Sequence, residues 1–206
     1  MASTDTKESI CSSAMNLLGE PAIASLTADT DDAARACAQL YDNVKWSLLA
    51  QYPWSFSKKK VQLARLVAAP TFGWRYQYTL PTDRVGELLA VFASSSVNAS
   101  PVLEFDIQDG KLLTNYPSIW IDYQYNVTEA TMPPHFAQLL IYVMAFNLAY
   151  PVTEDKEKTE YWRTVAYGTP SENMRGGYFR VACSIDGRAR PPEAINDFAL
   201  TDVRPV

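Results

Sequence analysis

The stretch Thr30–Phe56, TDDAARACAQLYDNVKWSLLAQYPWSF, decides the fold of this 206-residue chain. Apolar side chains recur in it at spacings of three and four residues, which places them on one face of a helix. Acidic residues precede these side chains, at the positive end of the helix dipole. Pro53 ends the pattern, because proline lacks the backbone N–H that a helix needs. We therefore predict a helix over about 31–51, with the buried face Ala34, Cys37, Tyr41, Val44 and Leu48.

Two large apolar side chains, Trp54 and Phe56, follow this helix directly. We expect them to pin the helix end at the place where a helical part meets a sheet part. The opposite face of the helix carries Arg35, Gln39, Asp42 and Lys45. That face is expected to meet either solvent or a neighbouring subunit, and the sequence does not choose between the two.

Three further helices follow from the same kind of pattern. The first helix is predicted over residues 5–18. Asp5 and Glu8 have the spacing of a capping box at its start, and Gly19 follows its end. Residues 134–150 open with a proline and are apolar nearly all round, which is typical of a central helix. We expect Pro151 to end that helix, and Thr153 to cap a fourth one that Gly168 and Pro170 weaken.

Residues 61–127 have the period of a sheet instead. Side chains alternate between apolar and polar over 74–80 and over 119–127, as in strands with one buried face. Asp109–Gly110 favours a tight hairpin, because both central residues of such a turn need positive φ. The basic run Lys58–Lys60 is expected to be a solvated turn.

These patterns predict an α+β fold: a bundle of about four helices with an inserted antiparallel β-rich region and an extended C-terminal arm. The arm follows from a stretch with three prolines and few apolar residues. The expected division is 1–56 plus 131–183 for the helical bundle, 57–130 for the β-rich region and 184–206 for the arm.

Composition indicates a folded globular protein, with 48% hydrophobic and 20% charged residues. The net charge of −5 disfavours binding to nucleic acid. Three cysteines without metal-like spacing read as buried, reduced side chains. The N-terminus lacks the pattern of a signal peptide, and no stretch reaches the length of about 20 apolar residues that a membrane span needs. We expect a chain made and folded in the cytoplasm, with no membrane insertion.

The sequence predicts no catalytic residue, no metal ligand and no cofactor. His135 is the single histidine and is expected to be a partly exposed residue at a helix start. No glycine-rich phosphate loop is present in the sequence. Two alternatives stay open: a polysaccharide-degrading enzyme and a carbohydrate-binding module. Their candidate carboxylates are Asp83, Glu104, Asp106 and Asp122, and their candidate aromatic residues are Trp74, Tyr76, Trp120 and Tyr123.

Several segments, taken in order over residues 8–150, carry a resemblance to one family. They are Leu17–Leu26 (LLGEPAIASL), Ala34–Arg35 in the acid-started helix, Tyr52–Phe56 (YPWSF), Phe72–Trp74 with Tyr78–Asp83, Gly110–Asn115 (GKLLTN) and Met132–Phe136 (MPPHF). Together they resemble the tail tubular protein A family, the head-to-tail adaptors of short-tailed bacteriophages. The C-terminal third departs from the family, whose longer unbroken helix is interrupted here by Thr169–Pro170.

The resemblance implies a non-enzymatic virion protein at the head–tail junction. It implies a ring of twelve copies between the portal and the tail nozzle, with helices toward the portal and neighbouring subunits and the sheet region toward the nozzle and tail fibres. DNA would pass through the channel without sequence-specific binding, and an acidic chain suits that passage because each phosphate contact adds affinity. The arm is expected to dock on the portal or a neighbouring adaptor. The predicted interface residues are Arg35, Gln39, Trp162, Arg188, Arg190 and Phe198.

Overall fold

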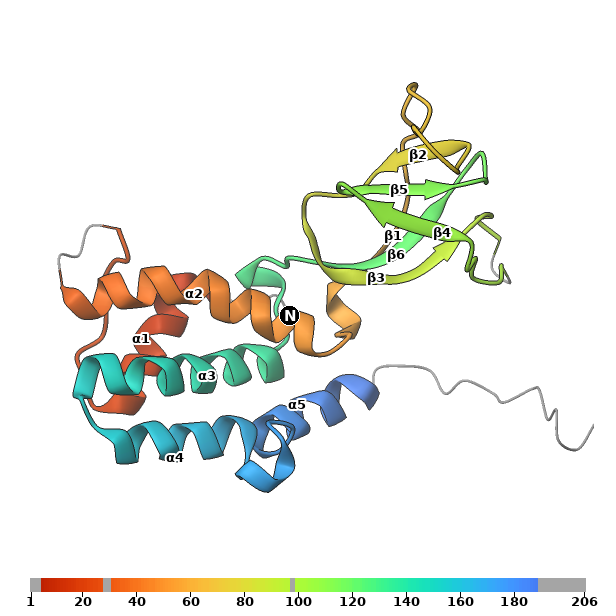
Figure 1. Cartoon of the computed structure of the whole chain (residues 1–206). Coiled ribbons are helices and arrows are strands. Elements are labelled where there is room, and N and C mark those ends of the chain that lie inside the picture. Colours follow the sequence, from red (N-terminus) through yellow and green to blue (C-terminus); the bar gives the residue numbers. More distant parts are fainter. Residues whose placement is uncertain (1–4, 28–30, 97–98, 189–206) are drawn as a thin grey trace, which may run out of the picture.

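The computed structural model describes residues 5–27, 31–96 and 99–188, and within them it has five α-helices and two three-stranded antiparallel sheets. Helices and sheets form two parts that lie side by side, with the sheets beyond the C-terminal end of the second helix (Figure 1). This confirms the α+β class and the insertion of the sheets between helices of one bundle. The described residues form five α-helices where the sequence predicted about four.

The helical part is built around its most apolar helix. It comprises α1 (Lys7–Leu18), α2 (Asp32–Gln51), α3 (Pro134–Thr153), α4 (Lys156–Tyr167) and α5 (Gly177–Arg188). Helix α3 contacts all four others, with α1 and α2 on one side and α4 and α5 on the other (Figure 1). The prediction of a central helix was therefore correct. Its length and composition would also allow a membrane span, so the expectation that no stretch is apolar enough was wrong. Half of its most apolar window is buried inside the protein.

Helix α2 confirms the period from which it was predicted, because all five residues of the expected inner face are buried. The prediction that Lys45 lies on the outer face is wrong. Lys45 is only 4% exposed, and its Nζ lies 3.0 Å from Glu129 Oε1. Tyr41 donates a hydrogen bond to the same carboxylate at 3.2 Å. Burial of a lysine needs such a partner, and this one comes from 84 residues further along the chain.

Helix ends differ from the predictions for local reasons. Thr6, not Asp5, caps α1, in a reciprocal pair with Ser9. Helix α3 continues through Pro151 to Thr153, since a proline in the last turn removes a single hydrogen bond. Thr153 does not cap α4 because its hydroxyl donates to the carbonyl of Ala149 within α3. Asp155 takes that role and accepts from the N–H groups of Glu157 and Lys158.

Helix α5 also corrects the expected arm. Residues 184–188 belong to this helix, whose inner face is Phe179, Ala182 and Asp186. The helical period was missed because one of these three buried positions holds an aspartate. The remainder of the predicted arm, 189–206, lies outside the described residues.

The two sheets enclose a second, smaller hydrophobic core. One sheet has the order β1 (Lys58–Gln62), β6 (Trp120–Tyr125), β3 (Arg84–Phe92), and the other has β2 (Tyr76–Thr79), β5 (Lys111–Thr114), β4 (Phe105–Gln108). Single bridges connect Arg65, which follows β1, to Tyr78 of β2, and Pro101, which precedes β4, to Phe92 of β3. Tyr78, Leu112, Ile119 and Ile121 fill the space between them.

Local predictions for the sheets had mixed outcomes. The hairpin is confirmed: β4 and β5 meet at Asp109 and Gly110, whose φ angles are 49° and 67°. Lys58–Lys60 is not a turn but the start of β1. Lys59 lies against the ring of Tyr125 and pairs with Asp83, so its charge is compatible with a strand. The strand expected over 74–80 is limited to Tyr76–Thr79.

Candidate interaction surfaces

The junction between the two parts is held by an aromatic cluster that follows α2. Trp54 is fully buried, its Nε1 donates to the Leu48 carbonyl at 2.9 Å, and its ring lies 5.1 Å from that of Phe136. Phe56 packs on both rings. From the sheet side, Gln124 donates to the carbonyl oxygens of Leu49 and Tyr52 at 3.0 and 2.9 Å. The expectation that Trp54 and Phe56 pin this junction is confirmed.

A buried carboxylate ties α5 to the same junction. Asp186 is 1% exposed and accepts from the backbone N–H of Ser55 at 3.0 and 3.1 Å and from its hydroxyl at 2.7 Å. His135 Nε2 lies 3.9 Å from the same carboxylate. Burial lowers the pKa of His135, and Asp186 partly opposes this shift. His135 is partly exposed in the first turn of α3, as predicted from the sequence.

This cluster holds a serine, a histidine and an aspartate, but not in a catalytic arrangement. The Ser55 hydroxyl donates to Asp186, so the histidine is not placed to accept its proton. Among the described residues, no three His, Cys, Asp or Glu side chains gather at a spacing that could hold a metal ion. Cys11 and Cys37 are buried neighbours between α1 and α2, and their mutual hydrogen bond together with burial raises the pKa of Cys11.

The outer face of α2 carries two of the predicted interface residues. Arg35 and Gln39 are exposed there, and Arg35 pairs with Asp32 one turn earlier. Asp42, on the same stripe, accepts from Lys7 of α1 at 2.7 Å. The next residue along the stripe is Trp46, which is 42% exposed and which the sequence analysis missed. Its spacing of four residues from Asp42 could have indicated it.

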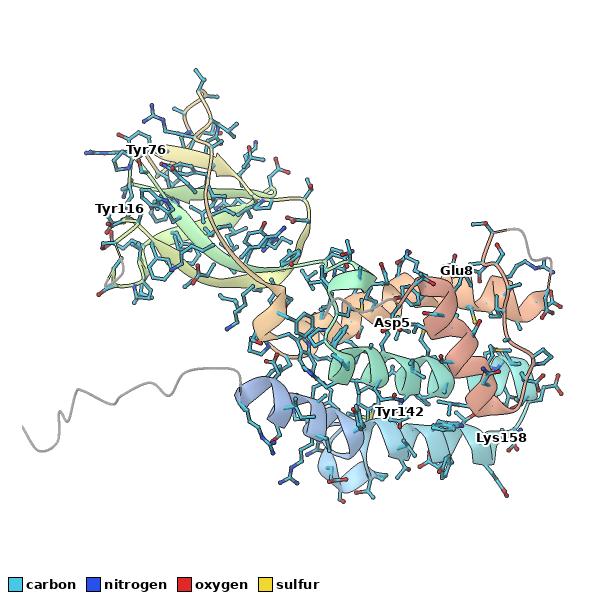
Figure 2. All side chains as sticks on the ribbon, turned by 180° about the vertical axis from the view of Figure 1, so that it is seen from behind. Asp5, Glu8, Tyr76, Tyr116, Tyr142 and Lys158 are labelled. Atoms are coloured by element: carbon cyan, nitrogen blue, oxygen red, sulfur yellow. The ribbon has the colours of Figure 1, made fainter. Side chains whose placement is uncertain are left out.

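Trp162 lies elsewhere, between helices. Its ring stacks on that of Tyr142 at 5.9 Å and 26°, so α4 packs on α3 through it. Tyr142 projects from α3 in the middle of the helical part, whereas Lys158 lies near the start of α4 (Figure 2). The neighbouring Tyr161 is 62% exposed and is the better-placed aromatic residue for an outside partner.

Arg188 is exposed on the last turn of α5, and Arg190 and Phe198 lie outside the described residues. The start of α2, with Arg35, and the end of α5, with Arg188, lie at opposite ends of the helical part (Figure 1). The structure therefore does not gather the predicted residues into one patch. It distributes those that it describes over different helices.

The far end of the sheet part has an open pocket of about 520 Å³. The loop 70–74 and strands β2, β4 and β5 form it, and its lining includes Phe72, Trp74, Gln77, Asp106, Gln108 and Lys111. Phe72 is 90% exposed at its rim, and Val67 and Leu103 are exposed apolar side chains of the same part. The labels of Tyr76, in β2, and Tyr116 show where the sheet part lies in Figure 2.

The candidate residues of the two carbohydrate alternatives do not converge on this pocket. Of the four carboxylates only Asp106 lines it, and of the four aromatic residues only Trp74 does. Asp83 binds Lys59 and Tyr123, and Asp122 pairs with Lys60, all on the other sheet. Lys59 and Tyr123 lower the pKa of Asp83 against the opposing effect of burial, and burial with Asp83 raises the pKa of Tyr123 to about 12.

Comparison with known proteins gives little to add. No protein-family model matches the chain, and no curated protein matches it. One of the solved structures to which it is similar is a chain in the neck of an empty gene transfer agent particle, computed with C6 symmetry. That match covers 80% of this chain and 95% of the other, at 15% identity and a TM-score of 0.28.

Proposed function

We propose that this protein is a non-enzymatic structural adaptor of a bacteriophage-like particle, which forms a ring between the portal and the tail nozzle. The observation that carries the proposal is the presence of exposed large apolar side chains in separate places on one chain. Trp46 lies on α2, Tyr161 on α4, and Val181 with Ile185 on α5, while Phe72 lies at the far end of the sheets. A ring contact is heterologous, so each copy needs two different adhesive faces.

The order of sequence segments that resembles the tail tubular protein A family supplies the biological setting of this proposal. In that setting twelve copies surround the DNA channel at the head–tail junction of a virion. The helical part, with α1 to α5, faces the portal and the neighbouring copies, and the sheet part faces the nozzle and tail fibres. The proposed contact residues are Arg35, Gln39, Trp162 and Arg188, with Arg190 and Phe198 in the segment beyond α5.

Native mass spectrometry of the full chain, alone and mixed with the portal protein of its particle, tests this proposal. We expect a discrete ring-sized complex in the mixture. A monomer that persists with portal at micromolar concentrations would contradict the proposal. A truncation after Arg188 tests the role of residues 189–206 in assembly without removing Asp186, which the junction needs.

A carbohydrate-binding module is a second candidate, and the pocket at the end of the sheets favours it. Aromatic rings can stack on a sugar while amides and carboxylates bind its hydroxyls, and Trp74 with Gln77, Asp106 and Gln108 offers both. Saturation-transfer NMR with oligosaccharides of the host surface tests this candidate. Binding that W74A abolishes and W46A leaves intact would support it, and the lack of any binding by the parent chain would end it.

A further inference from the structure

The outer face of α5 carries two exposed arginines beside exposed apolar side chains. Arg180, Ser184 and Arg188 follow one another at four-residue intervals, and Val181 and Ile185 form the adjacent stripe. The two apolar side chains are 47% and 38% exposed. Together these five residues line a shallow depression of about 310 Å³. Within the described part of the chain, neither arginine has a carboxylate within ion-pair distance, so an occupant with both carboxylates and an apolar side chain fits this face.

Such an occupant exists in the sequence beyond α5, at Glu193-Ala194-Ile195-Asn196-Asp197. Alternate residues of an extended chain share one face, so Glu193, Ile195 and Asp197 can project together. At about 3.3 Å per residue, Glu193 and Asp197 would stand about 13 Å apart. Arg180 and Arg188 are separated by about 12 Å along a helix that rises 1.5 Å per residue. Two carboxylates can thus meet two guanidinium groups, with Ile195 between them over Val181 and Ile185.

We propose that residues 193–197 of one copy dock on the α5 outer face of a neighbouring copy and hold adjacent subunits together. This inference rests on the proposed function, since it needs copies arranged side by side. Docking between copies is favoured over docking on the same copy because Arg188 ends α5, while the face extends back toward Arg180. A chain that returned to its own helix would have to reverse within 189–192. Pro191 and Pro192 oppose a tight reversal, because each restricts the residue before it to extended backbone.

The reach of the segment sets how close the two copies must lie. Glu193 is five residues beyond Arg188 and Asp197 is nine, so an extended chain at about 3.3 Å per residue carries them at most about 17 Å and about 30 Å from the end of α5. The segment can therefore dock on a neighbour whose α5 face begins within about 17 Å of that end.

Charge reversal in full-length chains tests the pairing. We expect R180E/R188E and E193R/D197R each to lose the ring-sized complex in native mass spectrometry at about 0.15 M salt, where exposed charges separated by less than a Debye length of about 8 Å still interact. A 1:1 mixture of these two variants should regain it, because every tail then meets a face of opposite charge on the other variant. R175E is the matched control, an exposed arginine outside this face, and it should assemble like the parent.

The chain with all four substitutions separates the two modes of docking. Rescue in that chain but not in the mixture would show docking within one copy and would overturn the proposal. Rescue in neither, or undisturbed rings in both single-sided variants, would overturn it as well. Circular dichroism of each variant establishes that its fold is retained.

A covalent readout separates this inference from the ring itself. In a C183S background, copies with S184C are mixed with copies with I195C under mild oxidation. We expect a covalent dimer in the mixture and little in either sample alone. If the dimer forms while native mass shows no ring, the proposed function fails and the docking stands. If rings form but the mixture yields no more dimer than its components, the docking fails and the proposed function stands.

Discussion

The helical part and the sheet part of this molecule present their exposed apolar side chains in different ways. In the helical part most of these side chains lie on helices, whose positions are fixed by a large common core around α3. In the sheet part Val67, Phe72 and Leu103 lie on connecting segments around a smaller core, while Leu89 lies on β3. Rigid elements suit contacts whose geometry is set in advance, whereas loops suit contacts that adapt. The helical part is thus better prepared for the repeated contact of a ring.

The largest predicted effect concerns the junction. W54A removes a fully buried side chain that contacts Phe56, Phe136 and Phe179, and should lower the free energy of unfolding by about 3–5 kcal/mol. Urea unfolding followed by circular dichroism measures it. W46A is the matched control on α2 and should cost less than about 1 kcal/mol, because that ring is 42% exposed. Equal losses for the two variants would contradict the role assigned to the junction.

Two ion pairs extend the comparison between the parts. K45M removes the buried cation that pairs with Glu129, leaving only the hydrogen bond from Tyr41 to that carboxylate, and should cost about 2–3 kcal/mol because the carboxylate stays largely buried. K59M removes the partner of Asp83 in the sheet part, where both side chains are about 40% exposed, and should cost less than about 1 kcal/mol. Chemical denaturation of both variants at pH 7 gives the difference. A larger loss of stability for K59M than for K45M would show that the ion pair of the sheet part contributes more than that of the helical part.

Two glycine substitutions should change the free energy of unfolding in opposite directions. G110A places a side chain at φ 67° in the β4–β5 hairpin and should cost about 1 kcal/mol. G187A lies near the end of α5, where the nearest atom to a new Cβ is the Tyr52 hydroxyl at 3.9 Å. It should stabilise the helix by about 0.5–1 kcal/mol, the difference in helix propensity between the residues. Thermal unfolding measures the change in melting temperature of each variant. A change in the same direction for both would contradict the conformations described for these two glycines.

The smallest effect is one of pH. Because burial lowers the pKa of His135, the unfolded chain takes up its proton more readily than the folded one. The stability that depends on the neutral ring is therefore complete above the ordinary pKa of about 6.5 and falls as the pH drops below it. Hydrogen exchange at pH 7.5 and 5.5, corrected for intrinsic rates, should show faster opening of the helical part at the lower pH.

The variant H135Q should flatten that response. The sheet part has no histidine, because the chain has only this one, and its relative protection should change little over the same interval. A larger loss of protection in the sheets than in the helices would show that another group controls the pH dependence.

The sequence was sufficient where burial followed a simple period. The inner face of α2 and the central position of α3 came from apolar spacing, and the β4–β5 hairpin came from Asp109–Gly110. It failed where a polar side chain is buried by a distant partner. Lys45 needs Glu129, and Asp186 needs Ser55, which lies 131 residues earlier. Such partners cannot be recognised from spacing within one helix, and for that reason residues 184–188 at the end of α5 were predicted as the start of an arm.

The candidate surfaces show the same limit. Arg35 and Gln39 are exposed on α2, whereas Trp162 is partly exposed and also packs between α3 and α4. Its partner Tyr142 comes from another helix, and a single sequence does not indicate that pairing. The arginines on α5 have no ion-pair partner within residues 5–27, 31–96 and 99–188, and this became apparent only when the helix had been placed and its neighbours were known.

The contact between Asp186 and Ser55 gives the molecule a path for mechanical load. Ser55 stands between α2 and β1, at the root of the sheets, and Asp186 stands two residues before the end of α5. Tension applied to the chain beyond Arg188 would therefore reach the root of the sheets through three hydrogen bonds at one serine. In an assembly that is pulled at its C-terminal segment, this carboxylate would transmit strain between the ends of the subunit instead of letting α5 unravel alone.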